Sequence, residues 1–307
     1  MKDAPLLSLG RALRGHGYRF ITPTPATIVR VNRRPENHSA TDLAGIFGWN
    51  RPFLETLIDR ALFAMLRDSR LILPTEGGWR SAVRASTLGE ALYFHSPFPT
   101  EDENAVFFGP DSYRFAQLLD CELQGAPAPR RLLDLGCGTG VGGLHVAHRL
   151  AGLELTLSDI NPSALAFARV NAALAGLAAT LLESDLFAAT SGQYDLIIAN
   201  PPYMMDAGRR TYRDGGGRFG EEISLRIVGD SLARLTPGGR LVLYTGSAIC
   251  RGRDGFASAL APLLDRAGLD YHYRELDPDV FGEELDQPAY REVDRIAAVA
   301  LTVTRTP

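Results

Sequence analysis

The stretch Leu132-Leu133-Asp134-Leu135-Gly136-Cys137-Gly138-Thr139-Gly140 decides the fold of this chain. An apolar run ends in glycines at every second position, and a helix is predicted to follow over residues 142–151. Glycine permits a sharp turn between a strand and a helix and lets the backbone approach a ligand closely. The start of the helix also presents unpaired N–H groups and a partial positive charge. The stretch therefore predicts a ligand-binding turn at the end of a buried strand.

Apolar strands alternate with helices from this turn to residue 304. Predicted strands cover residues 131–135, 154–158, 180–183, 196–199, 240–244, 271–275 and 295–304, and further helices cover 162–175, 222–235 and 256–267. Asn161 is the expected N-cap of the helix over 162–175, with Pro162 in its first position. This alternation predicts an α/β fold with a seven-stranded, mostly parallel Rossmann-like sheet and helices on both faces.

The first part of the chain has a different pattern. Small residues and prolines at 124–129 indicate a linker, so we expect an N-terminal α+β domain over residues 1–126 and a second domain over 127–307. The N-terminal pattern predicts strands over 17–19, 27–31, 71–74, 78–84 and 92–95, with helices over 41–47 and 53–67. Two helices followed by a strand pair are similar to a winged-helix module. The alternative is a small cap that recognises substrate or shapes its entrance.

Composition limits the functions open to the chain. A formal net charge of −4 and a pI of about 5.9 argue against a large electrostatic footprint on duplex DNA. The three cysteines are far apart and odd in number, so we expect neither a disulfide framework nor a metal site. We also expect no membrane span and no secretion signal, which makes the cytoplasm the default location.

A second motif, Asn200-Pro201-Pro202-Tyr203, directly follows the apolar run 194–199. The Asn carboxamide, beside a turn stiffened by proline, offers hydrogen-bond acceptors to a planar –NH2 group. The tyrosine ring can lie on the flat face of that group. The motif therefore predicts a pocket for an amide or an aromatic amine.

The spacing of the glycine-rich turn narrows the choice of ligand. Its glycines do not have the Gly-x-Gly-x-x-Gly spacing that supports a pyrophosphate, and Asp134 stands two residues before Gly136. A carboxylate at that position suits a ligand with a cationic amino group better than one with a diphosphate.

Residues 133–140 resemble the first motif of class I S-adenosylmethionine-dependent methyltransferases, and the order of the predicted strands fits the seven-stranded sheet of that family. The resemblance implies S-adenosyl-L-methionine as cofactor. It implies that Asp159 binds both ribose hydroxyls, and that Asp185 receives the adenine amine with Leu186 beside the ring. The expected cofactor-binding residues are Phe108, Asp134, Gly136, Cys137, Gly138, Gly140, Asp159, Ile160, Asp185, Leu186 and Asn200.

The Asn-Pro-Pro-Tyr motif is similar to that of the methyltransferase branch that modifies nitrogen conjugated to a π-system. Members of this branch act on exocyclic amines of adenine or guanine, or on a glutamine amide of peptide-chain release factors. The resemblance implies that the Asn200 side-chain oxygen and the Pro201 carbonyl accept the two N–H bonds while Tyr203 stacks on the planar group. Asn200, Pro201 and Tyr203 are therefore the expected catalytic residues.

Two segments bear on the substrate without deciding it. Residues 104–116 occupy the position of the element that covers the cofactor, but Gly109-Pro110 replaces a Pro-Arg pair common in release-factor enzymes. The arginine- and glycine-rich stretch 206–220 predicts either a mobile lid that contacts the substrate or a solvated loop. A protein amide or amine is the leading substrate, and a nucleic-acid base or a small amine or amide stays open.

Overall fold

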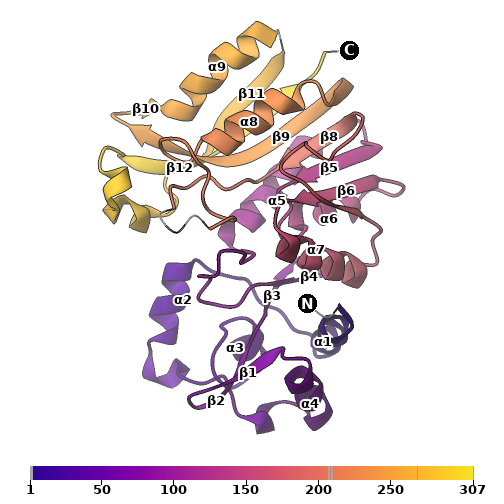
Figure 1. Ribbon diagram of the computed structural model, residues 1–307, viewed down its shortest axis with the longest axis vertical. Coiled ribbons are helices and arrows are strands. Elements are labelled where there is room, and N and C mark those ends of the chain that lie inside the picture. Colours follow the sequence, from indigo (N-terminus) through magenta and orange to yellow (C-terminus); the bar gives the residue numbers. More distant parts are fainter. Residues whose placement is uncertain (1–2, 207, 209, 268, 307) are drawn as a thin grey trace.

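The computed structural model describes residues 3–206, 208, 210–267 and 269–306. The N-terminal part, indigo to magenta in Figure 1, lies below a large sheet that is built from the later part of the chain. The long axis of the molecule runs through both parts, and helix α7 lies where they meet.

The large sheet has the strand order β11-β12-β9-β8-β5-β6-β7. Its strands are β5 (Arg131–Leu135), β6 (Glu154–Asp159), β7 (Thr180–Glu183), β8 (Tyr194–Ala199), β9 (Leu235–Cys250), β11 (Asp270–Asp277) and β12 (Arg295–Thr304), and the short β10 (Arg253–Asp254) pairs with β9. Strand β12 runs antiparallel to both of its neighbours, whereas β5 to β9 pair in parallel. The predicted sheet is confirmed. Its strand order reverses between β5 and β8, where open α/β sheets bind ligands.

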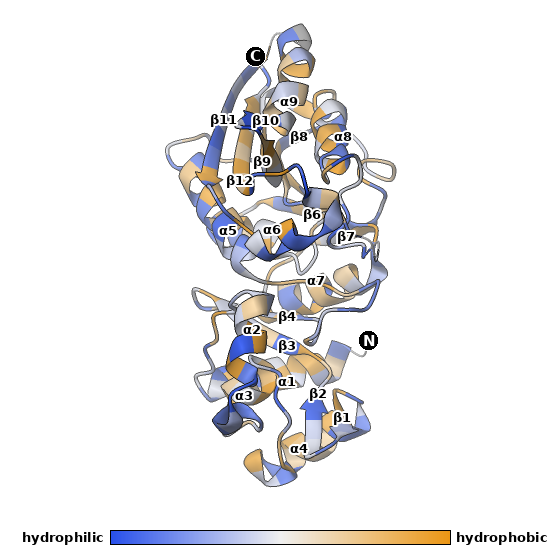
Figure 2. Cartoon of the chain, turned by 90° about the vertical axis from the view of Figure 1, so that its left-hand side faces the viewer, coloured by the Kyte–Doolittle hydropathy of each residue, from blue (hydrophilic) through white to orange (hydrophobic). Residues whose placement is uncertain are grey.

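Helices cover both faces of this sheet because successive side chains of a strand point to opposite sides. In β8, Leu196 and Ile198 pack in one core cluster with α5 (Pro110–Leu123), α6 (Val141–Ala147) and α7 (Pro162–Ala175). Ile197 and Ala199 pack in another cluster with α8 (Glu222–Ser231) and α9 (Gly255–Ala267). Figure 2 shows β12 largely hydrophobic between its neighbours and the edge strand β11 largely hydrophilic.

Helix α7 is buried on two sides and joins the two parts of the molecule. Leu165, Ala168 and Ala172 face the sheet, whereas Ala164, Phe167, Val170 and Leu174 pack with the N-terminal core. Its predicted N-cap is confirmed, since the Asn161 side chain accepts a hydrogen bond of 2.9 Å from the Ser163 N–H. The buried Asn171 amide donates to the carbonyls of Phe94 and Thr139, at 3.1 and 3.0 Å. The glycine-rich turn is thereby tied to the N-terminal part.

The N-terminal part contains four α-helices and two hairpins among its described residues. They are α1 (Asp3–Gly15), α2 (Pro25–Asn32), α3 (Leu43–Phe47), α4 (Arg60–Asp68), the pair β1 (Ile72–Thr75) and β2 (Gly78–Ser81), and the pair β3 (Arg84–Leu88) and β4 (Ala91–His95). The predicted strand over 17–19 is wrong, and the one over 27–31 lies in α2. There the Thr24 side chain caps the helix by accepting from the Thr27 N–H at 3.2 Å. This cap and Pro25 in the first turn outweigh the strand preference of Thr27, Ile28 and Val29.

The helix predicted over 53–67 begins only at Arg60, after the N-cap Asp59. Phe53 instead exchanges backbone hydrogen bonds of 2.8 and 2.9 Å with Trp79. The division of the chain at residue 126 stays a prediction, as does the winged-helix comparison. No helix in the described parts combines the length and the apolar character that crossing a membrane requires.

Candidate active site

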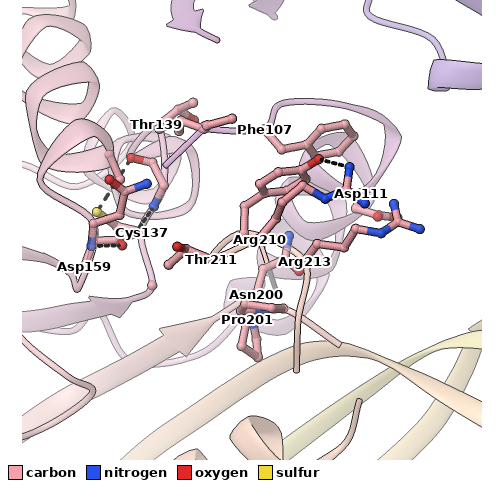
Figure 3. A pocket seen from close by; sticks show the side chains of 18 of the residues that line it. Phe107, Asp111, Cys137, Thr139, Asp159, Asn200, Pro201, Arg210, Thr211 and Arg213 are labelled. Carbon is pink, nitrogen blue, oxygen red and sulfur yellow. Dashed lines mark hydrogen bonds between the residues drawn. The ribbon is translucent and has the colours of Figure 1, made fainter. Parts of the chain in front are cut away.

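A cavity of about 840 Å³ lies at the carboxyl ends of β5, β6 and β8. Helix α2 and the segment 98–107 contribute its wall on the side of the N-terminal part. Figure 3 shows Asp159 and Cys137 on one side of the cavity, Asn200 and Pro201 below, and Arg210, Arg213 and Asp111 on the other side. Its volume is in the range of cofactor and small-molecule sites.

Most of the predicted site residues line this one cavity. They are Asp134, Gly136, Cys137, Gly138, Asp159, Ile160, Asp185, Leu186, Asn200, Pro201 and Tyr203. Two do not, and these two expectations are corrected. Phe108 is fully buried and stacks on Tyr93 and His95, so its neighbour Phe107 is the ring that lines the cavity. Gly140 faces the protein interior, because a Cβ there would lie 3.1 Å from Leu144 and 3.2 Å from Leu157, and its φ of 79° also favours glycine.

The glycine-rich turn needs its glycines for two separate reasons. Gly136 and Gly138 have φ angles of 63° and 54°, in the left-handed region that favours glycine. A Cβ on Gly136 would meet no protein atom within 4 Å, so the backbone there is free to approach a ligand. The turn has the shape that its sequence predicts.

Asp159 holds the turn in place. Its Oδ2 accepts a hydrogen bond of 2.8 Å from the Gly138 N–H, and its Oδ1 accepts one of 2.9 Å from the Asn161 N–H. Burial raises the pKa of this carboxyl, while the backbone N–H groups of Asn161 and Gly138 oppose the rise. A carboxylate has about four lone-pair sites, so each oxygen can accept one further hydrogen bond from a ligand.

Asp134 lies deeper in the same wall, 2% exposed, and its Oδ2 accepts from the Gly143 N–H at 2.8 Å. Burial raises its pKa to about 7, against the Gly143 hydrogen bond and with a further contribution from the charge of Asp159. Two buried carboxyl groups near one another favour a cationic ligand.

The far end of the cavity is more open. Asp185 forms an ion pair of 3.5 Å with Arg226, and both side chains are about half exposed. Ile160 is 54% exposed although it is apolar. Leu186 has a positive φ of 48° in the turn after β7. These side chains offer a polar edge and an apolar surface to a flat ring.

Asn200 follows the last residue of β8 and is partly buried, whereas Tyr203 is 7% exposed. The Tyr203 hydroxyl donates a hydrogen bond of 2.7 Å to Asp111 Oδ2. The loop that follows packs closely on the motif, since a Cβ on Gly215 would lie 2.7 Å from the Pro202 carbonyl oxygen and one on Gly220 2.3 Å from that of Tyr203. These glycines allow close packing in the stretch where the sequence suggests a mobile lid.

The arginine-rich loop crosses to the N-terminal wall of the cavity. Tyr212 stacks on Phe107 with ring centroids 5.8 Å apart, and its hydroxyl donates to the Thr100 carbonyl at 2.8 Å. Arg210 pairs with Asp206, and Arg213 pairs with Glu284 and Asp206. Arg209 lies outside the described residues. Sequence reasoning did not place Tyr212 or Asp111 in the site, although both belong to segments that it had singled out.

The strand order, the glycine-rich turn and the acids at the carboxyl ends of β5, β6 and β7 together define a class I S-adenosylmethionine-dependent methyltransferase. Comparison with known proteins agrees. Residues 114–249 match the family model of the methyltransferase small domain, and the chain belongs to the class I methyltransferases that carry this domain.

Two curated relatives and one solved structure show how far the similarity extends. A release factor glutamine methyltransferase from Deinococcus radiodurans is 33% identical over 195 residues, which cover 60% of this chain and 66% of that protein. A ribosomal RNA small subunit methyltransferase C from Sodalis glossinidius is 44% identical over 77 residues, or 25% of this chain and 22% of that protein. The crystal structure of wild-type Trm5b from Pyrococcus abyssi has a TM-score of 0.50 at 14% identity, covering 74% of this chain and 56% of that one. The last likeness concerns the fold alone.

The residues of the cavity fit S-adenosylmethionine. The bare backbone at Gly136 leaves room for close approach, and the buried Asp134 suits an amino group. Each Asp159 oxygen can accept one more hydrogen bond, as the ribose hydroxyls require. No cluster of three or more His, Cys, Asp or Glu side chains suited to a metal ion was found in the described ranges.

Proposed function

We propose that this protein transfers a methyl group from S-adenosylmethionine to a planar amide or amine nitrogen held at Asn200. The observation that carries the proposal is that one cavity contains both the glycine-rich turn with Asp134 and Asp159 and the Asn-Pro-Pro-Tyr motif. A ligand on the turn and a planar group at Asn200 would then share one space of about 840 Å³.

The chemistry explains why these residue types are needed. The lone pair of such a nitrogen is delocalised, so the nitrogen must become pyramidal before it attacks. The Asn200 side-chain oxygen and the Pro201 carbonyl oxygen favour that geometry by accepting hydrogen bonds from both N–H groups of the substrate. When bound, S-adenosylmethionine supplies a methyl group on a sulfonium sulfur that leaves as a neutral thioether. The nitrogen becomes cationic when the N–C bond forms and then releases one proton to solvent, so positioning contributes more than a strong base.

A protein amide or amine is the first candidate substrate. It is supported by the similarity to the Deinococcus radiodurans release factor glutamine methyltransferase, which extends over 60% of this chain. A small-molecule amine or amide remains an outcome of the substrate experiment below.

A nucleic-acid base is the second candidate, and helix α2 favours it. Pro25 and Val29 of α2 line the cavity, and Arg33 follows them at the same spacing of four residues. Arg30 and Arg34 flank Arg33, all three arginines are exposed, and none forms an ion pair among the described side chains. This row of α2 residues leads from the cavity to exposed arginines. The arginines could bind the phosphates of a nucleic acid while one of its bases enters the cavity.

The substrate class is tested with isotope-labelled S-adenosylmethionine and separated cell fractions of protein, RNA, DNA and metabolites. Label in protein supports the first candidate, and label in RNA or DNA supports the second. If no fraction takes up label while calorimetry shows no cofactor binding, the proposed function is wrong.

The role of α2 is tested by the double variant Arg30→Glu/Arg33→Glu. If the second candidate is right, the variant weakens binding of a labelled single-stranded RNA by at least about tenfold and flattens the salt dependence of that binding. Arg11→Glu/Arg60→Glu is the matched control, since it makes the same charge change at exposed arginines of α1 and α4. Equal losses in the two double variants would leave only a nonspecific effect of charge and refute the role of α2.

A further inference from the structure

A buried carboxylate outside the expected motifs contacts the Tyr203 side chain. Asp111 is the second residue of α5 and is 6% exposed. Its Oδ2 accepts a hydrogen bond from the Tyr203 hydroxyl and its Oδ1 accepts one from the Tyr244 hydroxyl, both at 2.7 Å. Arg114, one turn further along α5, lies 3.3 Å from Oδ1. Both oxygens of Asp111 are therefore used within the protein.

The ring of Tyr203 packs against strand β9 at Gly246, where the absence of a side chain leaves room for it. A Cβ on Gly246 would lie only 2.2 Å from Tyr203 Cδ2, so any other residue at this position would displace the ring. Gly246 pairs with Ala298 of β12 and has no positive φ, so backbone conformation does not explain the glycine. Tyr244 and Phe281 contact the same ring, with centroids 6.3 and 6.1 Å away.

We infer that Asp111, Tyr244 and Gly246 form a seat that fixes the orientation of the Tyr203 ring against the planar group of the substrate. Asp111 is a positioning residue, because it acts through the Tyr203 hydroxyl. This inference rests on the proposed function, in which Tyr203 stacks on the group that Asn200 binds. It assigns a role to residues from α5 and β9 that lie far from the motif in sequence.

The hydrogen bond to Asp111 also prevents the Tyr203 hydroxyl from donating a proton to the substrate. A hydroxyl that donates to a buried carboxylate has no proton left to give to the substrate. Burial and the negative charge of Asp111 raise the pKa of Tyr203 further above its ordinary value. The ring then offers its face as a rigid apolar surface, and its contribution to methyl transfer is orientation.

Asp111→Asn is the variant that tests the seat. The carboxamide keeps one acceptor oxygen, but its NH2 group faces the other tyrosine oxygen and can only donate to it, so one hydrogen bond reverses its direction and both lose the charge of the carboxylate. Loss of alignment lowers turnover at saturating cofactor by roughly 10- to 100-fold, because misplacement by about 1 Å has an effect of that size. The affinity for S-adenosylmethionine, measured by calorimetry, stays within about twofold, since the substituted contact is to Tyr203 and not to the glycine-rich turn.

A double-mutant cycle separates positioning from direct catalysis. If Asp111 acts through the Tyr203 hydroxyl, Asp111→Asn has little further effect in a Tyr203→Phe background. If the fold losses in turnover of the two single variants multiply in the Asp111→Asn/Tyr203→Phe double variant, the inference is overturned. Rates are measured on the cell fraction that the wild-type protein labels.

A spectroscopic measurement needs no substrate. Protein labelled with 3-fluorotyrosine gives a ¹⁹F resonance for Tyr203, which is identified by its loss in Tyr203→Phe. Asp111→Asn shifts this resonance, whereas Asp120→Asn, on an exposed turn of the same helix, does not. An unchanged Tyr203 resonance in Asp111→Asn overturns the seat. A shifted resonance in a protein that neither binds cofactor nor transfers methyl groups would sink the proposed function and leave the contact intact.

Discussion

Replacing Asp159 by Ala tests the cofactor site most directly, because this residue serves both the fold and the ligand. Its two oxygens accept the N–H groups of Gly138 and Asn161 at 2.8 and 2.9 Å. The same oxygens are expected to accept both ribose hydroxyls. The Asp159→Ala variant therefore loses two internal hydrogen bonds and two bonds to the cofactor.

The expected magnitudes of the two losses can be estimated separately. Hydrogen bonds to a charged group contribute about 1.5–3 kcal/mol each, so the loss of two to the cofactor weakens binding by about 3–6 kcal/mol. That corresponds to roughly 10²- to 10⁴-fold in the dissociation constant. Leaving two backbone N–H donors without acceptors costs about 1–3 kcal/mol each in the free energy of unfolding.

The matched control is Asp195→Ala at the start of β8. Asp195 Oδ2 also accepts two backbone N–H groups, those of Arg130 and Arg131, at 2.9 and 3.0 Å. This side chain does not line the cavity. Both variants should lower the melting temperature, but only Asp159→Ala should lose calorimetric affinity for S-adenosylmethionine. Unchanged affinity in Asp159→Ala, or an equal loss in both variants, would refute the ribose assignment.

Two further predictions concern the same cavity. Asn200→Ala should keep the cofactor dissociation constant nearly unchanged but lower turnover by at least about 100-fold, because it removes an acceptor that aligns the nitrogen; equal losses in affinity and turnover would make Asn200 structural. The pKa of Asp134 is raised to about 7, so this carboxyl holds a proton below that pH and becomes anionic above it. Affinity for the cationic cofactor should therefore rise between about pH 6 and pH 8 in the wild type and stay flat in Asp134→Asn, and calorimetry across that range checks both.

Elements with local start and stop signals could be predicted from the sequence residue by residue. The helix over 162–175 is an example, because Asn161 caps its start and Gly176, with a φ of 70°, ends it. The strands over 131–135, 180–183 and 295–304 were also predicted at their observed bounds. The β-branched residues of 27–31 predict a strand there, but the Thr24 cap places these residues in the helix over 25–32.

Site residues, too, could be predicted only where a local sequence signal marks them. Residues of the glycine-rich turn and of the Asn-Pro-Pro-Tyr motif could be found because their neighbours in sequence carry the signal. The seat of Tyr203 could not, since Asp111 precedes Tyr203 by 92 residues and Tyr244 follows Asp111 by 133. Only the packing of α5 against β9 brings them together. The expected Phe108 faces the core and its neighbour Phe107 lines the cavity, because the sequence of two adjacent aromatic residues gives no sign of which one is buried.

Asp134 and Asp159 are two buried acids beside the glycine-rich turn, and their mutual repulsion would be lowered by a bound cation. Asp134 and Asp159 are 2% and 8% exposed, and burial, with a smaller contribution from the charge of Asp159, raises the pKa of Asp134. Each is kept in place by a backbone N–H from the turn or the helix that follows it, Gly143 for Asp134 and Gly138 for Asp159. The turn is thus preformed at the cost of bringing two carboxyl groups together, and a ligand with a positive amino group lowers that cost. The pairing of these acids therefore favours a cationic cofactor over a diphosphate on electrostatic grounds as well as on glycine spacing.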